Sequence, residues 1–374
     1  MPASLYIHIP YCTSKCPYCD FASVPLDASA GAYLRALLKE AAHYSAILDT
    51  IKTVYIGGGT PSVLIPDQIS GLFKGLRKAF SFSPDAEITI EANPCSLNEE
   101  KALALARNGV NRISLGVQSF IDAELQILGR RHTSHEATRA IVTAREAGIG
   151  NVSIDLIYAI PNQSLESWQY SLAQAIELKP EHISAYCLTF EQRTPFQRLL
   201  HEGKIEKKSE DEELEFFETV RRMLEQAGYE HYEISNFARP GKRSLHNTVY
   251  WRNEEYLGLG AGAVSYISGR RICNLREPEA YIDAMENRGD AVCEIDEISP
   301  HMQAVETIIQ RLRLREGIDC RVFMERFGVH PEEILGGSLP ELIGLDMLEQ
   351  TSDAIRARPK GWHLANEVAL KILP

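Results

Sequence analysis

Three cysteines near the start of the chain, Cys12, Cys16 and Cys19, have the spacing C-x-x-x-C-x-x-C. Three thiolates can each bind one iron of a four-iron cubane and leave the fourth iron open to a second molecule. Such a site can carry an electron and also bind a ligand, which suits it to catalysis. We therefore interpret the triplet as the ligand set of a [4Fe–4S] cluster.

Two other interpretations of the triplet, a zinc site and three unrelated loop cysteines, are weaker. A zinc site would ordinarily recruit a fourth nearby Cys or His, whereas Asp20 and Phe21 follow Cys19. Three unrelated loop cysteines are a weaker alternative because the triplet is so tight. The remaining cysteines are scattered and form no disulfide framework, as in a reducing compartment. They are Cys95, Cys187, Cys273, Cys293 and Cys320.

The composition describes an ordinary globular protein. The chain has 374 residues, of which 44% are hydrophobic and 24% charged, enough for one large and one smaller domain. Its net charge of −12 argues against nucleic acid as the main partner, because phosphate binding depends on clustered Lys and Arg. No apolar run is long enough to cross a membrane, and the N-terminal segment lacks a basic signal region. We expect a cytoplasmic protein.

Short β-rich runs alternate with longer amphipathic runs through the first two thirds of the chain. The expected strands are residues 5–9, 53–56, 87–91, 112–117, 152–157 and 182–188. The expected helices are residues 32–48, 67–80, 99–108, 134–147 and 165–178. This alternation predicts an α/β fold with a parallel sheet and right-handed crossovers. Candidate ligands follow the carboxyl ends of strands, as in barrel enzymes, so a partial (β/α)6 barrel is favoured over a doubly wound sheet.

The alternation of β-rich and amphipathic runs stops after Glu233, and a loop rich in Arg, Pro and Gly follows. We predict a barrel domain over residues 1–235 and a smaller, mainly helical domain over residues 236–374. A hairpin among helices would give this second domain a winged-helix-like end. DNA binding by such an end is disfavoured by the acidic balance of the chain.

Candidate ligand-binding residues recur at the strand ends. Gly57, Gly58 and Gly59 follow one expected strand, and glycines there let the backbone approach a ligand closely, although a purely structural turn would look the same. Each of the later polar residues could by itself be a surface or capping residue. Together they supply carboxylates, an amide and a guanidinium, which suit a zwitterionic, ribose-bearing ligand. These residues are Glu91, Gln118, Arg130 and Asp155.

With the segments IHIPYC, YEISNFARPG, HNTVYW and YLGLGAGA, these motifs resemble those of the radical S-adenosylmethionine (SAM) family over nearly the whole chain. The resemblance is to its HemW branch, which is related to oxygen-independent coproporphyrinogen III oxidase. It implies a [4Fe–4S] cluster on Cys12, Cys16 and Cys19, with SAM on the open iron, cleaved to methionine and a 5′-deoxyadenosyl radical. It also implies which residues line the SAM pocket: Tyr6, Tyr18, Gly58, Gly59, Thr60, Glu91, Gln118, Arg130 and Asp155.

The resemblance further implies a haem chaperone. His246 begins a match to the H-N-x-x-Y-W motif associated with haem in that branch, so we predict it to be a haem ligand. The alternative is the oxidase, whose members carry a further cysteine where this chain has Phe21, and an N-terminal extension. A nucleic-acid-modifying radical enzyme is the third class, disfavoured by charge. Whether the chain is an enzyme in the strict sense is left open.

The partners implied by the resemblance are haem as cargo, acceptor haemoproteins such as membrane-associated respiratory enzymes, and an electron donor such as flavodoxin or ferredoxin. Nucleic acid is not expected, and any membrane contact would be peripheral, through an acceptor. The chain departs from related sequences at Ala159 and Asn162, where IYAIPNQ replaces the commoner IYGLPGQ, and at Val264 in GAGAVS. These changes leave the charged pocket positions intact.

Overall fold

A computed structural model describes residues 3–48 and 50–373, and a nine-stranded sheet organises most of them. In spatial order the strands are β11 (Leu257–Leu259), β1 (Ser4–Ile9), β4 (Ile51–Gly58), β5 (Phe82–Ala92), β6 (Arg112–Gln118), β7 (Asn151–Tyr158), β8 (His182–Cys187), β10 (Asn236–Ala238) and β9 (Glu230–Glu233). From β11 to β8 all neighbours are parallel, whereas β10 and β9 pair antiparallel. The predicted parallel sheet is confirmed.

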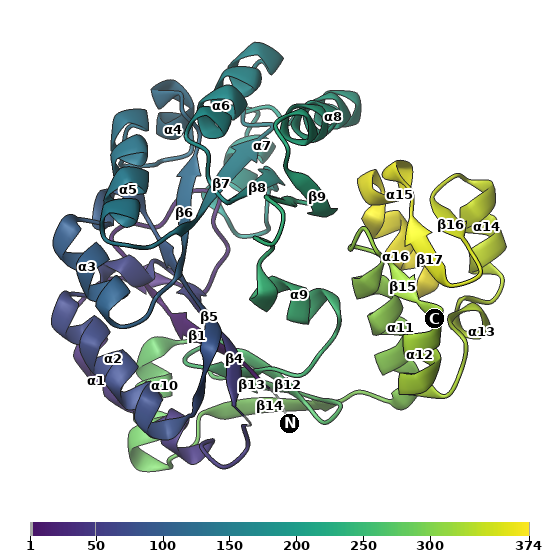
Figure 1. Cartoon of the computed structure of the whole chain (residues 1–374). Coiled ribbons are helices and arrows are strands. Elements are labelled where there is room, and N and C mark those ends of the chain that lie inside the picture. Colours follow the sequence, from purple (N-terminus) through teal and green to yellow (C-terminus); the bar gives the residue numbers. More distant parts are fainter. Residues whose placement is uncertain (1–2, 49, 374) are drawn as a thin grey trace.

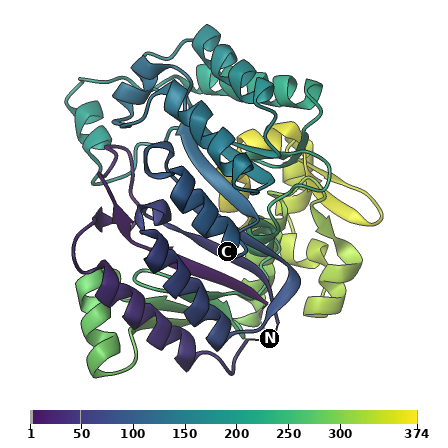
Figure 2. The same ribbon diagram turned by 60° about the vertical axis from the view of Figure 1, so that its left-hand side comes forward.

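Helices cover the outer face of the curved sheet (Figure 1 and, turned, Figure 2). They are α1 (Ala30–His43), α2 (Pro66–Ala79), α3 (Glu99–Arg107), α5 (Ser134–Glu146) and α6 (Leu165–Glu177). Their apolar stripes pack on strands whose side chains, such as Ile56 and Ile113, are fully buried. The α/β partial barrel is therefore confirmed, although the predicted helix over residues 32–48 ends at His43.

Three helices of the barrel were not among those expected from the sequence: α4 (Asp122–Ile127), α7 (Pro195–His201) and α8 (Glu210–Gln226). Helix α8 begins at Ser209, which forms a capping box with Glu212. It buries Phe216, Val220 and Leu224 against the main core, while its many charged residues face away from that core.

Helix α9 (Leu245–Trp251) lies on the concave side of the sheet (Figure 1). The backbone N–H groups of Leu245 and His246 donate to the Glu87 carboxylate of β5, at 3.1 and 3.0 Å. A carboxylate at a helix N-terminus satisfies amides that have no partner within the helix and complements the helix dipole. Thr53, which pairs with Glu87, lies near the amino end of β4, so α9 lies toward that end of the barrel.

A small antiparallel sheet joins the barrel to the rest of the chain, through β12 (Val264–Ile267), β13 (Arg270–Asn274) and β14 (Val292–Glu297). Helix α10 (Pro278–Asn287) packs on α1, and the main hydrophobic core extends to Ala291. The boundary predicted between residues 235 and 236 thus falls inside the unit that shares the large sheet, because β10 and β11 follow it in the sequence and join that sheet.

A second hydrophobic core runs from Ala304 to Ile372. Its elements are α11 (Pro300–Arg311), β15 (Ile318–Asp319), α12 (Cys320–Phe327), α13 (Pro331–Leu335), α14 (Ser338–Gly344), β16 (Leu348–Gln350), β17 (Ala354–Ala357), α15 (Pro359–His363) and α16 (Ala365–Ile372). Helix, strand, helices and hairpin follow one another in the order of a winged-helix-like unit. Within residues 3–48 and 50–373, no helix is both long and apolar enough to span a bilayer.

Candidate functional site

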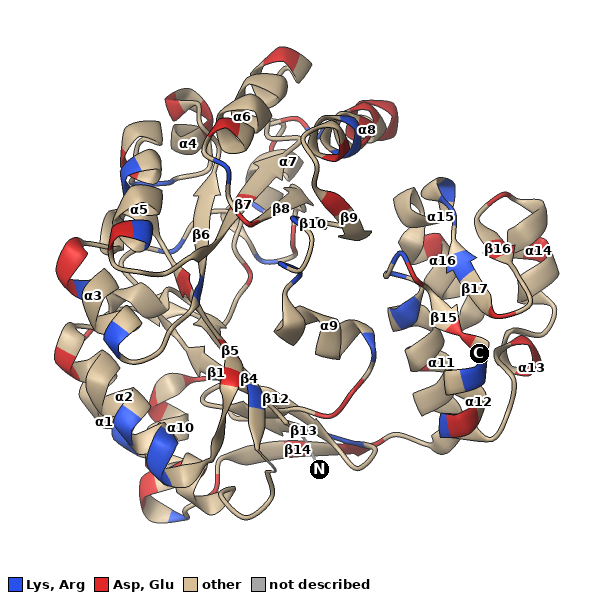
Figure 3. Ribbon diagram, in the orientation of Figure 1, with Lys and Arg blue, Asp and Glu red and all other residues tan. Residues whose placement is uncertain are grey.

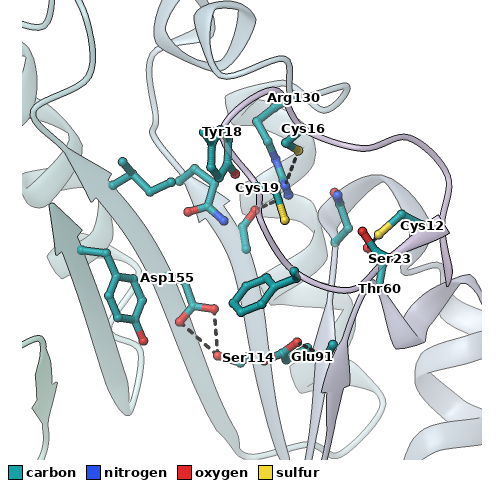
Figure 4. Close-up of a pocket in the computed structure, with 18 of the residues that line it drawn as sticks. Cys12, Cys16, Tyr18, Cys19, Ser23, Thr60, Glu91, Ser114, Arg130 and Asp155 are labelled. Carbon is teal, nitrogen blue, oxygen red and sulfur yellow. Dashed lines mark hydrogen bonds between the residues drawn. The ribbon is translucent and has the colours of Figure 1, made fainter. Parts of the chain in front are cut away.

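A pocket of about 730 Å³ opens at the carboxyl ends of strands β4 to β8. Cys12, Cys16 and Cys19 all line it: Cys12 ends the short strand β2 (Tyr11–Cys12), and the other two lie in the loop from β2 to its partner β3 (Val24–Pro25). Figure 4 shows the three cysteines on one side of this pocket and the strand residues Glu91, Ser114 and Asp155 beneath them. The structure thus brings the predicted cysteine loop and the predicted strand-end residues to one place.

Two of the three thiols have a polar side chain beside them. Cys12 Sγ lies 3.3 Å from Thr60 Oγ1, and Arg130 Nη1 donates to Cys16 Sγ at 3.4 Å. Across the described part of the chain, no three His, Cys, Asp or Glu side chains are grouped to hold one metal ion. A cubane takes one thiolate per iron, so its ligands need not converge on a single point. Three cysteines on one loop, with a guanidinium beside them, fit such a cluster.

Two glycines at the end of β4 bring backbone to the pocket. Gly58 has φ +108°, and a Cβ there would lie 2.5 Å from the His8 ring. A Cβ on Gly59 would lie 2.7 Å from the carbonyl oxygen of Tyr11, next to the cysteine loop. Neither position can accept a side chain without moving its neighbours, so the glycines hold the β4 turn tightly against the loop that carries Cys12.

Glu91, near the end of β5, is half-buried at the pocket wall. Its carboxylate accepts hydrogen bonds from the Tyr55 hydroxyl at 2.8 Å and from the Gly58 N–H at 3.2 Å. Burial, with a further contribution from the charge of Asp155, raises the pKa of Glu91 to about 7. Such a carboxyl group is sensitive to an incoming cation, because an ammonium group nearby would favour its ionised form.

Asp155, on β7, lies deeper in the pocket. Ser114 Oγ on β6 lies 3.0 Å from each of its carboxylate oxygens (Figure 4), and Ser184 on β8 also donates to it. Burial raises the pKa of Asp155, and these hydroxyl groups oppose the rise. Gln118 ends β6 with φ +68°, a left-handed conformation that turns the chain at the pocket rim.

Arg130 is half-buried between the cysteine loop and β6, with its Nε fully buried. Its Nη2 donates to the Gly116 carbonyl at 2.8 Å, its Nη1 to Cys16, and its Nε has no partner in the described chain. A buried N–H without an acceptor is costly, and a bound carboxylate would satisfy it. This arrangement suits the carboxylate of an amino-acid-like ligand.

Most of the residues predicted for the SAM site do line the pocket: Tyr18, Gly58, Gly59, Thr60, Glu91, Gln118, Arg130 and Asp155. Tyr6 is not among the lining residues, and its hydroxyl group instead lies 3.0 Å from Nδ1 of His8. The sequence interpretation missed several others: Tyr55, Arg112, Ser114, Ser184, Tyr186, Cys187 and Asn247. A signal was present for Arg112 and Ser114, which share a strand face with Gly116 and Gln118 at a period of two.

His246 lies behind the pocket, not in it. The side chain is 0% exposed, its Nδ1 lies 2.8 Å from Thr53 Oγ1, and its Nε2 lies 2.9 Å from the Tyr250 hydroxyl group. Burial, and then the charge of Arg112, lower the pKa of His246 to about 3, so the ring is neutral. Neutral imidazole is the form that binds iron, but in this conformation both nitrogens are engaged.

Comparison with known proteins agrees with this geometry. A family model described as the Radical SAM superfamily matches residues 6–175, and one described as the HemN C-terminal domain matches residues 298–364. The chain is 37% identical to the heme chaperone HemW of Lactococcus lactis over 100% of this chain and 97% of the relative. It is 37% identical to the heme chaperone HemW of Escherichia coli over 94% of this chain and 93% of the relative.

Among solved structures, coproporphyrinogen III oxidase (HemN) from Escherichia coli, described as a radical SAM enzyme, matches with a TM-score of 0.87. That match covers 99% of this chain and 90% of the other at 26% identity. A chain with this cysteine loop, glycine turn and set of strand-end carboxylates thus also matches these proteins in sequence and fold over nearly its whole length. The chain belongs to the HemW branch of the radical SAM family.

Proposed function

We propose that this protein is a haem chaperone that binds a [4Fe–4S] cluster, SAM and haem, and delivers haem to acceptor haemoproteins. The observation that carries the proposal is the 37% identity over the full chain to a protein named as a heme chaperone. The pocket adds support, since its three cysteines and its strand-end carboxylates have the chemistry that a cluster and SAM require.

In this proposal Cys12, Cys16 and Cys19 hold the cluster, and SAM lies beside it. Arg130 is placed to donate from its free Nε to the SAM carboxylate. Glu91 and the turn at Gly58 are placed to accept from its ammonium group, and Asp155 to bind ribose hydroxyl groups. When bound, cluster and SAM would supply one-electron chemistry, while the protein orients SAM and excludes water.

His246 remains the proposed haem ligand, with a condition that the geometry imposes. Nδ1 must leave Thr53, or Nε2 must leave Tyr250, before that nitrogen can reach iron. Helix α9 is short, and its first two amides are held by Glu87 alone, so a shift of this helix would carry the ring away from Thr53 and free Nδ1, while Tyr250 moves with it. We propose that haem is bound in such a shifted state.

The proposed setting is the cytoplasm, with respiratory haemoproteins, some of them membrane-associated, as acceptors. Flavodoxin or ferredoxin is the proposed source of the electron that the cluster needs. An exposed Phe21, at 68% of its surface, lies on the cysteine loop where a docked protein could reach it.

The second candidate is oxygen-independent coproporphyrinogen III oxidase, favoured by the match to the Escherichia coli enzyme at a TM-score of 0.87. Against it stands Phe21, in place of the further cysteine that such oxidases carry. Anaerobic incubation of the reconstituted protein with coproporphyrinogen III, SAM and reductant separates the two. We expect haem binding and no protoporphyrinogen; turnover to protoporphyrinogen would favour the oxidase.

A further inference from the structure

A second cavity, of about 880 Å³, lies at the opposite end of the barrel from the cysteines. It is a groove bounded by the start of β4, one side of α9, the β12–β13 hairpin, and helices α11 and α12. Lys52 and Thr53 of β4 line this groove, whereas Gly58 of the same strand lines the cysteine pocket. The two cavities therefore lie at opposite ends of the sheet.

The groove gathers cations on a chain with a net charge of −12. Five cationic residues line it against only two acidic ones, Glu254 and Glu255. The cations come from separate elements, and Figure 3 shows blue segments at the end of α9 and on α12. They are Lys52, Arg243, Arg252, Arg311 and Arg326.

Several of these cations lack a carboxylate of their own. The side chain of Arg311 makes no hydrogen bond or ion pair with the described residues, and burial, then the charge of Arg252, lower its pKa. Arg326 donates only to the backbone carbonyls of Arg252 and Asn253, at 3.1 and 2.6 Å. Arg252 shares one carboxylate, that of Glu316, with Arg243. The arrangement leaves guanidinium N–H groups free for an anion.

The same groove also exposes apolar surface. Leu245 is 54% exposed and Val322 is 39% exposed, and both line it next to the arginines. A ligand that covers these side chains and also pairs with the arginines must combine an apolar body with anionic groups. A volume of this size is typical of pockets for small molecules and cofactors.

We propose that this groove binds the carboxylate-bearing edge of a porphyrin, with the side chains of Arg252, Arg311 and Arg326 pairing with its two propionates. The inference rests on the proposed haem-chaperone function and names where that cargo docks. The groove lies next to the predicted haem ligand, since Thr53 lines it and contacts His246 directly behind. Helix α9 separates it from the SAM pocket, because Asn247 of the same helix lines the latter.

The test uses the full-length, cluster-reconstituted protein and three probes: haemin, protoporphyrin IX, and protoporphyrin IX dimethyl ester, which lacks the two negative charges. Arg311→Gln and Arg326→Gln should each weaken binding of haemin and protoporphyrin roughly tenfold to a hundredfold, since each removes charge-assisted hydrogen bonds. Neither change should affect the dimethyl ester. Arg311→Lys should recover part of the loss. Arg288→Gln is the matched control, because Arg288 is exposed on the barrel away from the groove.

SAM affinity, measured on every variant, checks that the barrel is intact. Unchanged haemin affinity in both groove variants would contradict the porphyrin site in the groove and leave the proposed haem-chaperone function standing. A wild-type protein that binds no haemin would contradict both the site and the function. Equal losses of affinity for protoporphyrin IX and for its dimethyl ester would show that the arginines act on the fold and would overturn the proposal. The groove would instead be assigned to a membrane surface if the variants lost binding to anionic phospholipid vesicles but kept their affinity for haemin.

Discussion

The hydroxyl group of Thr53 lies 2.8 Å from Nδ1 of His246, and this contact ties helix α9 to strand β4. Thr53 faces the cationic groove on one side and the buried imidazole on the other. Tyr55 stacks on the face of the ring at a centroid distance of 5.3 Å. His246 is thus held one side chain away from the groove, and access to it depends on breaking this contact.

Thr53→Val should tighten haem binding if His246 is the iron ligand. The change leaves Nδ1 buried without a partner, which costs the closed state about 1–3 kcal/mol. A larger fraction of molecules is then open, and the apparent haem affinity rises by roughly fivefold to a hundredfold. Thr53→Ser, which keeps the hydroxyl group, is the control. A haem titration in which Thr53→Val binds no more tightly than wild type would argue against this route to His246.

The buried histidines should make the protein less stable in mild acid. Burial lowers the pKa of His246 to about 3, and those of His132 and His231 to about 4, against about 6.5 in the unfolded chain. Protons therefore favour the unfolded state, and this part of the stability is full above pH 6.5 and is lost as the pH falls toward 4.

Because burial raises the pKa of Glu40 and Glu91 to about 7, those groups act in the opposite direction. The measurement is therefore a difference: the free energy of unfolding of wild type minus that of His246→Gln, at pH 7.5 and at pH 5. We expect this difference to shrink by about 1–2 kcal/mol at the lower pH. His135→Gln, at a surface position, should show no such change; a pH-independent difference for His246→Gln would contradict the assignment of a neutral buried ring.

Cys12, Cys16 and Cys19 should be the only cluster ligands. Alanine at any of them should lower the iron content and the charge-transfer absorption of the anaerobically reconstituted protein. Cys187 supplies a stringent control, since it lines the same pocket, but burial and the nearby Glu213 raise the pKa of its thiol to about 12. Full cluster content in a triple alanine variant, or its loss in Cys187→Ala, would point to a different ligand set.

Arg130→Ala and Asp155→Asn should each weaken SAM binding by one to two decades, since each removes a charge-assisted contact. Arg130→Lys keeps the charge but not the planar fork, so its loss should be intermediate. Ser114→Ala removes only a neutral donor to Asp155 and should cost less. Anaerobic calorimetry at matched cluster content measures these affinities. Wild-type affinity in both Arg130→Ala and Asp155→Asn would move the SAM site elsewhere.

The barrel could be predicted because each strand is a short buried run and each helix has an apolar stripe. Helix α8 was missed because four acidic residues fill its first turn and leave only a narrow stripe around Phe216 and Val220. The boundary predicted at residue 235 follows the end of the alternation, whereas β10 and β11 come later in the sequence and still pair in the large sheet. Pairing between distant strands leaves no local periodicity.

The strand-end site was predictable for the same reason as the barrel, because parallel strands bring their carboxyl ends to one edge. The place of Asn247 in the pocket and the cationic groove could not be predicted, because α9 packs back on the barrel from more than a hundred residues beyond β6. Ala159 and Asn162, where related chains more often carry glycine, have φ of 60° and 66°. That left-handed conformation is the one glycine adopts most easily, and here non-glycine residues accommodate the same turn.

The most direct test of the account is an anaerobic absorption titration of the cluster-reconstituted protein with haem, followed by addition of an apo-haemoprotein acceptor. We predict a stoichiometric Soret band of protein-bound haem that shifts to the spectrum of the acceptor on mixing, while coproporphyrinogen III incubated with the same preparation and SAM is not converted. Absence of saturable haem binding, together with formation of protoporphyrinogen, would contradict the haem-chaperone function.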